Sequence, residues 1–199
     1  MEETLTPEEV LTIEKEILTF ISETEEEILP AWRRRRRWAR AHAARRFRRR
    51  TGISYKRMIQ RDIMPKTDLS SDTAPFAAEK WERSVTASAN SWALWIDKEL
   101  EEDKSALFDG IVLHDLTDQK FTFVRFWLGT SAVKAIYSLT KAYKSREPII
   151  RFRTPIKYDP KEHIRIEVYT TMANPTIDLE LTGVITEPVG KTIGKPAGE

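Results

Sequence analysis

Residues 164–185 read IRIEVYTTMANPTIDLELTGVI, and this stretch is the clearest indication of the fold class. Apolar and polar residues alternate over residues 164–171, and the same alternation returns over residues 177–185. Alternation with period two predicts strands that bury one face and expose the other to water. The turn residues Ala173, Asn174 and Pro175 separate the two runs, so we expect the runs to pair as an antiparallel hairpin.

Strand patterns recur in the segments that precede this pair. The candidates are residues 107–116 (LFDGIVLHDL), 121–128 (FTFVRFWL) and 149–158 (IIRFRTPIKY). Pro155 in the last of them marks an edge strand or a bulge. Residues 91–96 fit a strand or a helix start equally well. Residues 132–143 space their apolar side chains at three and four, which predicts a short helix.

These elements predict an α+β chain in which a helical, arginine-rich arm precedes an antiparallel β-sandwich. Clean alternation gives each sheet one wet face, which excludes a buried parallel sheet. We expect residues 1–66 to form the arm and residues 67–78, which are small and polar, to be a linker. The sandwich would then span residues 79–188, and residues 189–199 would be an exposed tail.

The arm contains the sequence WRRRRRWARAHAARRFRRR at residues 32–50, with eleven arginines and no acidic residue. Alanine and arginine have high helix propensity, so we expect a helix over residues 31–50 that stops at Thr51 and Gly52. The arginines cover most of the circumference of that helix. The sequence therefore defines no single side of it that would face phosphate.

Guanidinium groups at this density need counter-charge, and a polyanion supplies it well through the release of condensed counterions. Arginine also binds phosphate in a bidentate way. The candidate nucleic-acid-binding residues are Arg33, Arg34, Arg35, Arg36, Arg37, Arg40, Arg45, Arg46, Arg48, Arg49, Arg50, Lys56, Arg57 and Arg61. The aromatic residues Trp32, Trp38 and Phe47 would stack on bases of a single strand, or anchor the segment to protein in a duplex complex. The alternative is a solvated basic face paired with acidic protein.

The charge of the chain is strongly divided, although its net charge is only +2. Residues 1–30 carry ten Glu and one Lys, whereas residues 31–62 carry fourteen Lys or Arg and one Asp. A capping box at Thr6 and Glu9 predicts an acidic amphipathic helix over residues 6–29. Its apolar stripe would pack on its own domain or on a neighbouring subunit. A second amphipathic helix is predicted over residues 54–63.

The sequence carries few signs of catalysis. It has no cysteine, no glycine-rich phosphate loop and no nucleophile elbow. His42, His114 and His163 have no partner at metal-ligand spacing, so we expect no catalytic residue, no metal and no cofactor. No apolar run reaches the length of a membrane helix, and we expect no membrane span. Only four residues are Asn or Gln, which fits a protein from a hot environment.

An arginine-rich arm followed by a β-sandwich resembles the coat proteins of viruses with a single jelly-roll shell domain. Residues 33–50 carry the likeness of the arm, and residues 121–128, 149–158, 164–171 and 177–185 that of the strands. The strands recognised are fewer than the eight of a jelly roll, which leaves open another sandwich or an accessory capsid protein. The composition would fit a virus of a thermophile.

The resemblance implies a virion structural protein that self-assembles and binds the packaged genome without reading its sequence. Its partners would be genomic nucleic acid, copies of itself and other virion proteins. It would reside in the virion, and in the host cytoplasm before assembly. A cellular nucleic-acid-binding protein with the sandwich as a partner-binding module is the alternative, and a sandwich enzyme is a third hypothesis.

Overall fold

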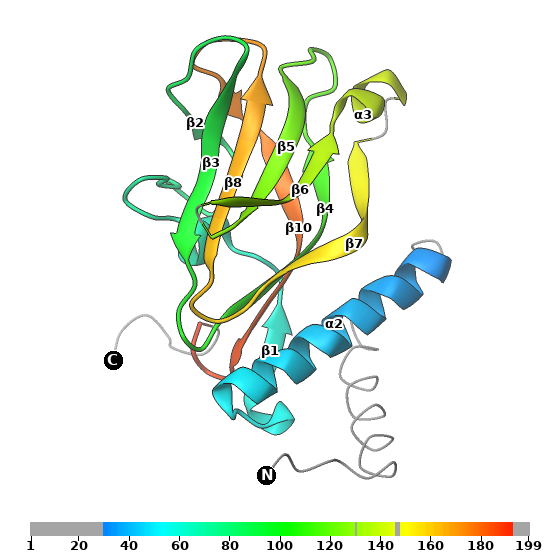
Figure 1. Ribbon diagram of the computed structural model, residues 1–199, viewed down its shortest axis with the longest axis vertical. Coiled ribbons are helices and arrows are strands. Elements are labelled where there is room, and N and C mark those ends of the chain that lie inside the picture. Colours follow the sequence, from blue (N-terminus) through cyan, green and yellow to red (C-terminus); the bar gives the residue numbers. More distant parts are fainter. Residues whose placement is uncertain (1–29, 130, 146–147, 193–199) are drawn as a thin grey trace.

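The computed structural model describes residues 30–129, 131–145 and 148–192 (Figure 1). The acidic helix predicted over residues 6–29 and most of the predicted tail lie outside these residues. Within them, two four-stranded antiparallel sheets pack face to face, and one long helix lies against the first sheet. The predicted sandwich after a basic helix is therefore confirmed.

Sheet 1 has the strand order β1-β10-β4-β7, and sheet 2 has the order β3-β8-β5-β6. The strands of sheet 1 are β1 (Met58–Arg61), β10 (Leu179–Pro188), β4 (Ser105–Leu113) and β7 (Ile149–Tyr158). Those of sheet 2 are β3 (Ser91–Glu99), β8 (His163–Thr170), β5 (Phe121–Leu128) and β6 (Ala132–Ser138). A short pair, β2 (Arg83–Ser84) with β9 (Thr176–Ile177), closes one end.

The core lies between the two sheets and is rich in aromatic side chains. Phe108 of sheet 1 packs against Phe126 of sheet 2, with ring centroids 6.2 Å apart, and Trp95 is completely buried. Tyr137 of β6 stacks on Phe152 of β7, which joins the two sheets at their edge strands, with ring centroids 4.0 Å apart. The alternation seen in the sequence thus places one face of every long strand into a single apolar core.

The predicted hairpin of residues 164–171 with 177–185 is wrong. β8 pairs with β3 and β5 in sheet 2, whereas β10 pairs with β1 and β4 in sheet 1. The connecting segment crosses between the sheets and forms β9 on the way. Both strands bury alternate residues in the same core from opposite sides, so the local pattern is the same for a hairpin and for a crossover.

Two predicted helices contain a strand in place of a continuous helix. Within residues 54–63, a single 3₁₀ turn (Tyr55–Arg57) leads into β1, whose partner is the end of β10. Within residues 132–143, β6 forms first, and a short helix, α3 (Thr140–Ser145), follows. In both cases a neighbouring strand supplies the backbone hydrogen bonds, and this pairing outweighs the local helical spacing.

Residues 67–78, predicted as a linker, pack on the sandwich. A single π-helical turn, Pro65–Leu69, begins this stretch. Leu69, Ala74 and Phe76 are buried, and Leu69 and Phe76 belong to the main core. The segment therefore closes the end of the sandwich as well as connecting two elements.

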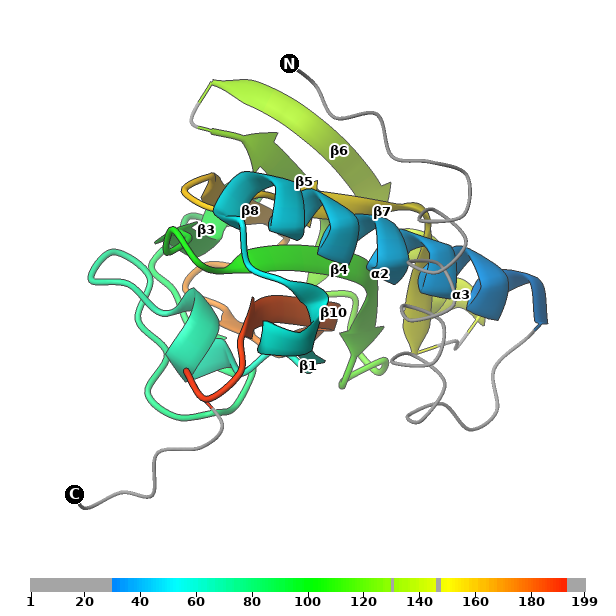
Figure 2. The same cartoon turned by 90° about the horizontal axis from the view of Figure 1, so that it is seen from below.

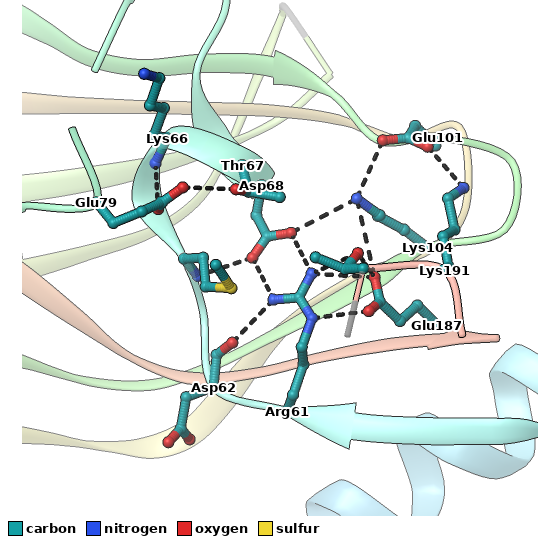
Figure 3. A network of polar contacts seen from close by, with 12 residues as sticks. Arg61, Asp62, Lys66, Thr67, Asp68, Glu79, Glu101, Lys104, Glu187 and Lys191 are labelled. Atoms are coloured by element: carbon teal, nitrogen blue, oxygen red, sulfur yellow. Dashed lines mark hydrogen bonds and ion pairs between the residues drawn. The ribbon is translucent and has the colours of Figure 1, made fainter. Parts of the chain in front are cut away.

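A buried ion-pair network joins this segment to sheet 1 (Figure 3). Arg61 of β1 donates two hydrogen bonds to each of two carboxylates, Asp68 at 2.7 Å and Glu187 at 2.8 and 3.0 Å. Lys104 lies 3.6 Å from Asp68 and 3.9 Å from Glu187. All four side chains are buried, so two cations and two anions balance one another away from water.

Burial alone would lower the pKa of Arg61, but its hydrogen bonds to Asp68 and Glu187 outweigh that effect and raise the pKa. Its guanidinium also donates to the Asp62 carbonyl and the Thr192 hydroxyl. The prediction that Arg61 binds nucleic acid is therefore wrong. Its donors are committed to the interior, where it joins β1 to β10 and the turn at Asp68.

Candidate nucleic-acid interface

The arginine-rich segment forms one helix, α2 (Pro30–Thr51), which lies along the outer face of sheet 1 and contacts β4, β10 and β7 (Figure 2). Ala39 and Ala43 pack on Leu107 and Val184, which point away from the main core. Because alanine is small, the helix axis comes close to the sheet.

Phe47 anchors the C-terminal half of α2. It is almost fully buried and packs with Ala44 and Met58. Of the two roles considered for the aromatic residues, Phe47 therefore has that of an anchor and is not available for base stacking. The side chains of Trp32 and Arg33 lie outside the described part of the chain.

An aspartate of sheet 1 holds the N-terminal half of the helix. Asp109 is only 1% exposed and accepts a hydrogen bond from Arg36 Nε at 2.6 Å and another from the Thr182 hydroxyl at 2.7 Å. The pairings of β4 with both neighbours shift between Phe108 and Gly110, so Asp109 sits in a β-bulge. A bulge re-aims a side chain, and here it directs the carboxylate toward α2.

The glycine that follows is required by this arrangement. A Cβ atom at Gly110 would lie 2.7 Å from the Ile150 carbonyl oxygen and 2.8 Å from the Thr182 hydroxyl oxygen. Both distances are shorter than real Cβ contacts. Gly110 therefore leaves room for the hydroxyl that supports the Asp109 carboxylate.

A second aspartate holds the C-terminal half. Asp159, which directly follows β7, is buried and accepts a hydrogen bond from Arg46 Nε at 2.6 Å, with Arg50 at 3.8 Å. Together with Asp109 it sets the rotation of α2 about its own axis. Arg36 and Arg40, both predicted to bind nucleic acid, consequently face the sheet: the Arg36 side chain is 15% exposed, and Arg40 is buried. That prediction is corrected for these two residues.

The other arginines of α2 whose side chains are described are exposed or half-buried and form its outer surface. Arg34, Arg35, Arg46, Arg48, Arg49 and Arg50 are exposed, and Arg37 and Arg45 are half-buried. Lys56 and Arg57, also exposed, follow in the 3₁₀ turn after the helix. Packing on the sheet thus fixes which side of the helix faces outward, and the sequence alone did not indicate that side. We call these ten residues the basic face.

Strand β7 adds three cations that were not predicted as site residues. Arg151 and Arg153 are exposed, and Lys157 is half-buried beside the helix, with its Nζ 2.8 Å from His42 Nδ1. Burial and the nearby Arg46 lower the pKa of Lys157. The signal was present in the sequence, because residues 151, 153 and 157 share one face of an alternating strand. This pattern points to a binding surface only when it is known that α2 lies against the same face of the strand.

Replacing Asp109 by asparagine should loosen α2. Arg36 would lose its carboxylate in a site with little water, and we expect a loss of about 2–3 kcal/mol in the free energy of unfolding. Amide hydrogen exchange should accelerate in residues 39–47 more than in the strands. Asp72→Asn, an exposed aspartate on a loop, is the control. Unchanged exchange in the helix would show that Asp109 does not hold it.

The described residues contain no group of three or more metal-ligating side chains placed to hold a metal ion. His163 Nε2 lies 2.6 Å from an Asp97 oxygen, and His114 Nε2 lies 3.3 Å from a Glu180 oxygen. Asp97 also accepts a hydrogen bond from the Thr73 hydroxyl at 2.8 Å. No helix in the described part of the chain is long and apolar enough to cross a membrane.

No protein-family model matches the chain, and no curated protein matches it either. Among solved structures, it is similar to the C-terminal CBM6 of LamC, a marine laminarinase from Zobellia galactanivorans. The two share 6% sequence identity over 64% of this chain and 98% of that one, with a TM-score of 0.30. A similarity at that level supports no argument about function.

Proposed function

We propose that this protein is a virion structural protein that self-assembles and binds the packaged genome through the basic face. The observation that carries the proposal is the seating of α2 on two buried aspartates of the sandwich. The arginines on its outer side are held in place before any ligand arrives, so a polyanion would meet a surface that is already formed.

Binding would rest on phosphate charge and not on base sequence. Where α2 contacts β4, β10 and β7 it lies with its side against sheet 1, so the basic face is the flank of a packed helix. The recognition helix of a sequence-reading motif instead enters the major groove. Each phosphate neutralised by a guanidinium releases condensed counterions, whatever the base it carries. Such binding suits a partner that must be packaged along its whole length, and no catalytic step, metal or cofactor enters the proposal.

The strand order supports the jelly-roll part of the proposal. Setting aside the short pair β2 and β9, the eight strands in the described part of the chain divide equally between the sheets. Lettered B to I along the chain, they run B-I-D-G in sheet 1 and C-H-E-F in sheet 2. This is the order expected of a jelly roll, which viral capsid domains share with lectins and cupins.

The outer face of sheet 2 supports self-assembly. Three exposed apolar side chains, Phe123, Val133 and Ile136, lie on its neighbouring strands β5 and β6. Exposed apolar side chains clustered in this way indicate a contact surface.

The charges on this face also suit contact with a second copy. Arg125 and Arg165 both bind the buried carboxylate of Glu167, and Asp97 lies opposite Arg165 on β3, so the charges are largely paired within the face. A second copy can therefore approach this face without like-charge repulsion. Two copies that met through the basic face of α2 would repel each other. We propose that contacts between subunits use this face, while the basic face on the opposite sheet remains open to the genome.

The proposal is tested on protein purified gently at low salt. Light scattering should find large particles, and the ratio of absorbance at 260 and 280 nm should reveal bound nucleic acid. Ile136→Asp should give smaller species that still carry nucleic acid, because it places a charge in the proposed contact. Met172→Asp, an exposed apolar residue outside β5 and β6, is the matched control and should assemble like the parent.

Each other outcome of this test has a definite meaning. A small species that carries nucleic acid would favour the alternative of a cellular nucleic-acid-binding protein with the sandwich as a partner-binding module. A small species without nucleic acid, which also fails to bind added nucleic acid, would overturn both functions. It would indicate that acidic protein neutralises the arginines instead.

A further inference from the structure

We propose that the nucleic acid bound by the basic face is single-stranded, and that Trp38 is the platform on which one of its bases stacks. This inference rests on the proposed function and names the class of nucleic acid. Phosphate binding by the arginines gives no role to the exposed side chain of Trp38.

Trp38 is the most exposed large hydrophobic side chain of the described residues, at 68%, and it lies midway along a helix of arginines. Its neighbours on the sheet side, Ala39 and Ala43, are buried, so its exposure follows from the rotation of α2. An exposed indole contributes nothing to the core of the sandwich. In a protein that binds nucleic acid, such a ring is a surface for stacking a base.

The indole is supported from behind and held in place. Its ring stacks on His42 with centroids 5.4 Å apart and an interplanar angle of 26°. His42 is one helical turn further on, and its Nδ1 lies 2.8 Å from Lys157 Nζ, which itself lies 5.6 Å from the Trp38 ring centroid. A ring restrained in this way loses little conformational freedom when a base is added to it.

The support is uncharged near neutral pH. Burial lowers the pKa of His42, and so do the charges of Lys157, Arg46, Arg45 and Arg49. The imidazole is therefore neutral and accepts a hydrogen bond from the lysine ammonium at Nδ1. A neutral ring stacked on an indole extends the aromatic surface without adding another cation to this crowded region.

Cations flank the platform along the helix and across to the sheet. Arg34 and Arg35 lie one turn before Trp38, and Arg45 and Arg49 lie two and three turns after it on the same side. Arg153 of β7 is exposed on the outer face of sheet 1. The helix rises about 1.5 Å per residue, so Arg34 to Arg49 span about 22 Å. That length accommodates several nucleotides, with phosphates on either side of the stacked base.

A duplex would not use this arrangement. Its bases are stacked within the helix and present only their edges in the grooves. Because α2 is packed along sheet 1, Trp38 lies on the side of a helix that is held against the sandwich. From there the indole could reach neither the faces of paired bases nor the floor of a groove. A basic surface that follows the backbone, combined with an aromatic ring open for stacking, is the arrangement that binds single strands without sequence preference.

The test compares two ligands on the full chain by fluorescence anisotropy, a labelled oligothymidylate and a random-sequence DNA duplex of the same length. Trp38→Ala should weaken single-strand binding by about 5- to 150-fold, the effect of one lost stacking contact. Duplex affinity should change by less than about 2-fold. Trp38→Phe retains a ring and should keep most of the affinity for the single strand. Thermal melts should match the parent, because Trp38 is exposed.

The outcomes separate this inference from the function on which it rests. If Trp38→Ala weakens both ligands equally, or neither, the stacking platform is refuted while binding by the basic face stands. If the parent binds neither ligand, the proposed function fails and the platform fails with it. If Trp38→Ala instead reduces particle size and leaves single-strand affinity unchanged, Trp38 is a subunit contact and the inference is overturned.

Discussion

Replacing Arg34, Arg35 and Arg49 together by glutamine should weaken nucleic-acid binding by about 10²–10³-fold at about 0.1 M salt. The three residues are exposed on the outer side of α2. Each phosphate contact contributes about 0.9 to the slope of log K against log salt on a duplex and about 0.7 on a single strand. Loss of three contacts should therefore reduce that slope by about 2–3. A salt titration of binding measures both quantities.

Glutamine is chosen because its helix propensity is close to that of arginine, so α2 should persist in the variant. The matched control replaces three exposed lysines away from this helix, Lys66, Lys80 and Lys144, by glutamine and changes the net charge equally. If both triple variants lose affinity to the same extent, binding depends on net charge alone. The basic face would then have no special role.

Replacing Arg61 by methionine should cost about 3–5 kcal/mol of the free energy of unfolding, which is a large part of the stability of a typical domain. The variant retains the buried carboxylates of Asp68 and Glu187 but leaves Lys104 as the only buried cation between them. One of the two negative charges would then be uncompensated in the interior. Urea unfolding should find a lower midpoint with an unchanged m-value.

Arg57→Met is the control for this variant. Arg57 lies four residues earlier in an exposed 3₁₀ turn, so the same change of side chain should alter stability by less than about 0.5 kcal/mol. Arg61→Lys keeps the charge but loses the planar fork that reaches both carboxylates, and should fall between the two. Equal stability of Arg57→Met and Arg61→Met would mean that the network in Figure 3 contributes nothing.

Arg57 and Arg61 show which part of the candidate site could be predicted from the sequence. Arg57 and Arg61 stand in the same basic stretch, and both were predicted to contact nucleic acid. The structure leaves Arg57 on the surface and buries Arg61, because β1 pairs with β10 and thereby faces Glu187. One of the two carboxylates that bind Arg61, Glu187, lies 126 residues away in the sequence, so no local pattern could indicate that pair.

The strands show the same division. The alternation over residues 121–128 and 149–158 predicted β5 and β7 with the observed bounds, because period-two burial is a property of each strand alone. Assignment of strands to sheets depends on which backbone partner is nearest in space. The mistaken hairpin of β8 with β10 arose at that step. The mistaken helix at β6 arose because its local spacing is helical, whereas pairing with β5 makes it a strand.

Local sequence determined that this chain would have a basic helix and alternating strands, since helix propensity, charge and periodicity act over a few residues. The wet outer face expected of each sheet is not found throughout, because α2 covers part of that face of sheet 1. The identity of the inward and outward arginines was decided by tertiary structure. A bulge at Asp109 and the end of β7 at Asp159 place two carboxylates under α2, and these select Arg36 and Arg46 as partners. This rotation buries Arg40 and turns Trp38 and the arginines of the basic face toward solvent, because a helix has one rotation and two buried charges are enough to set it.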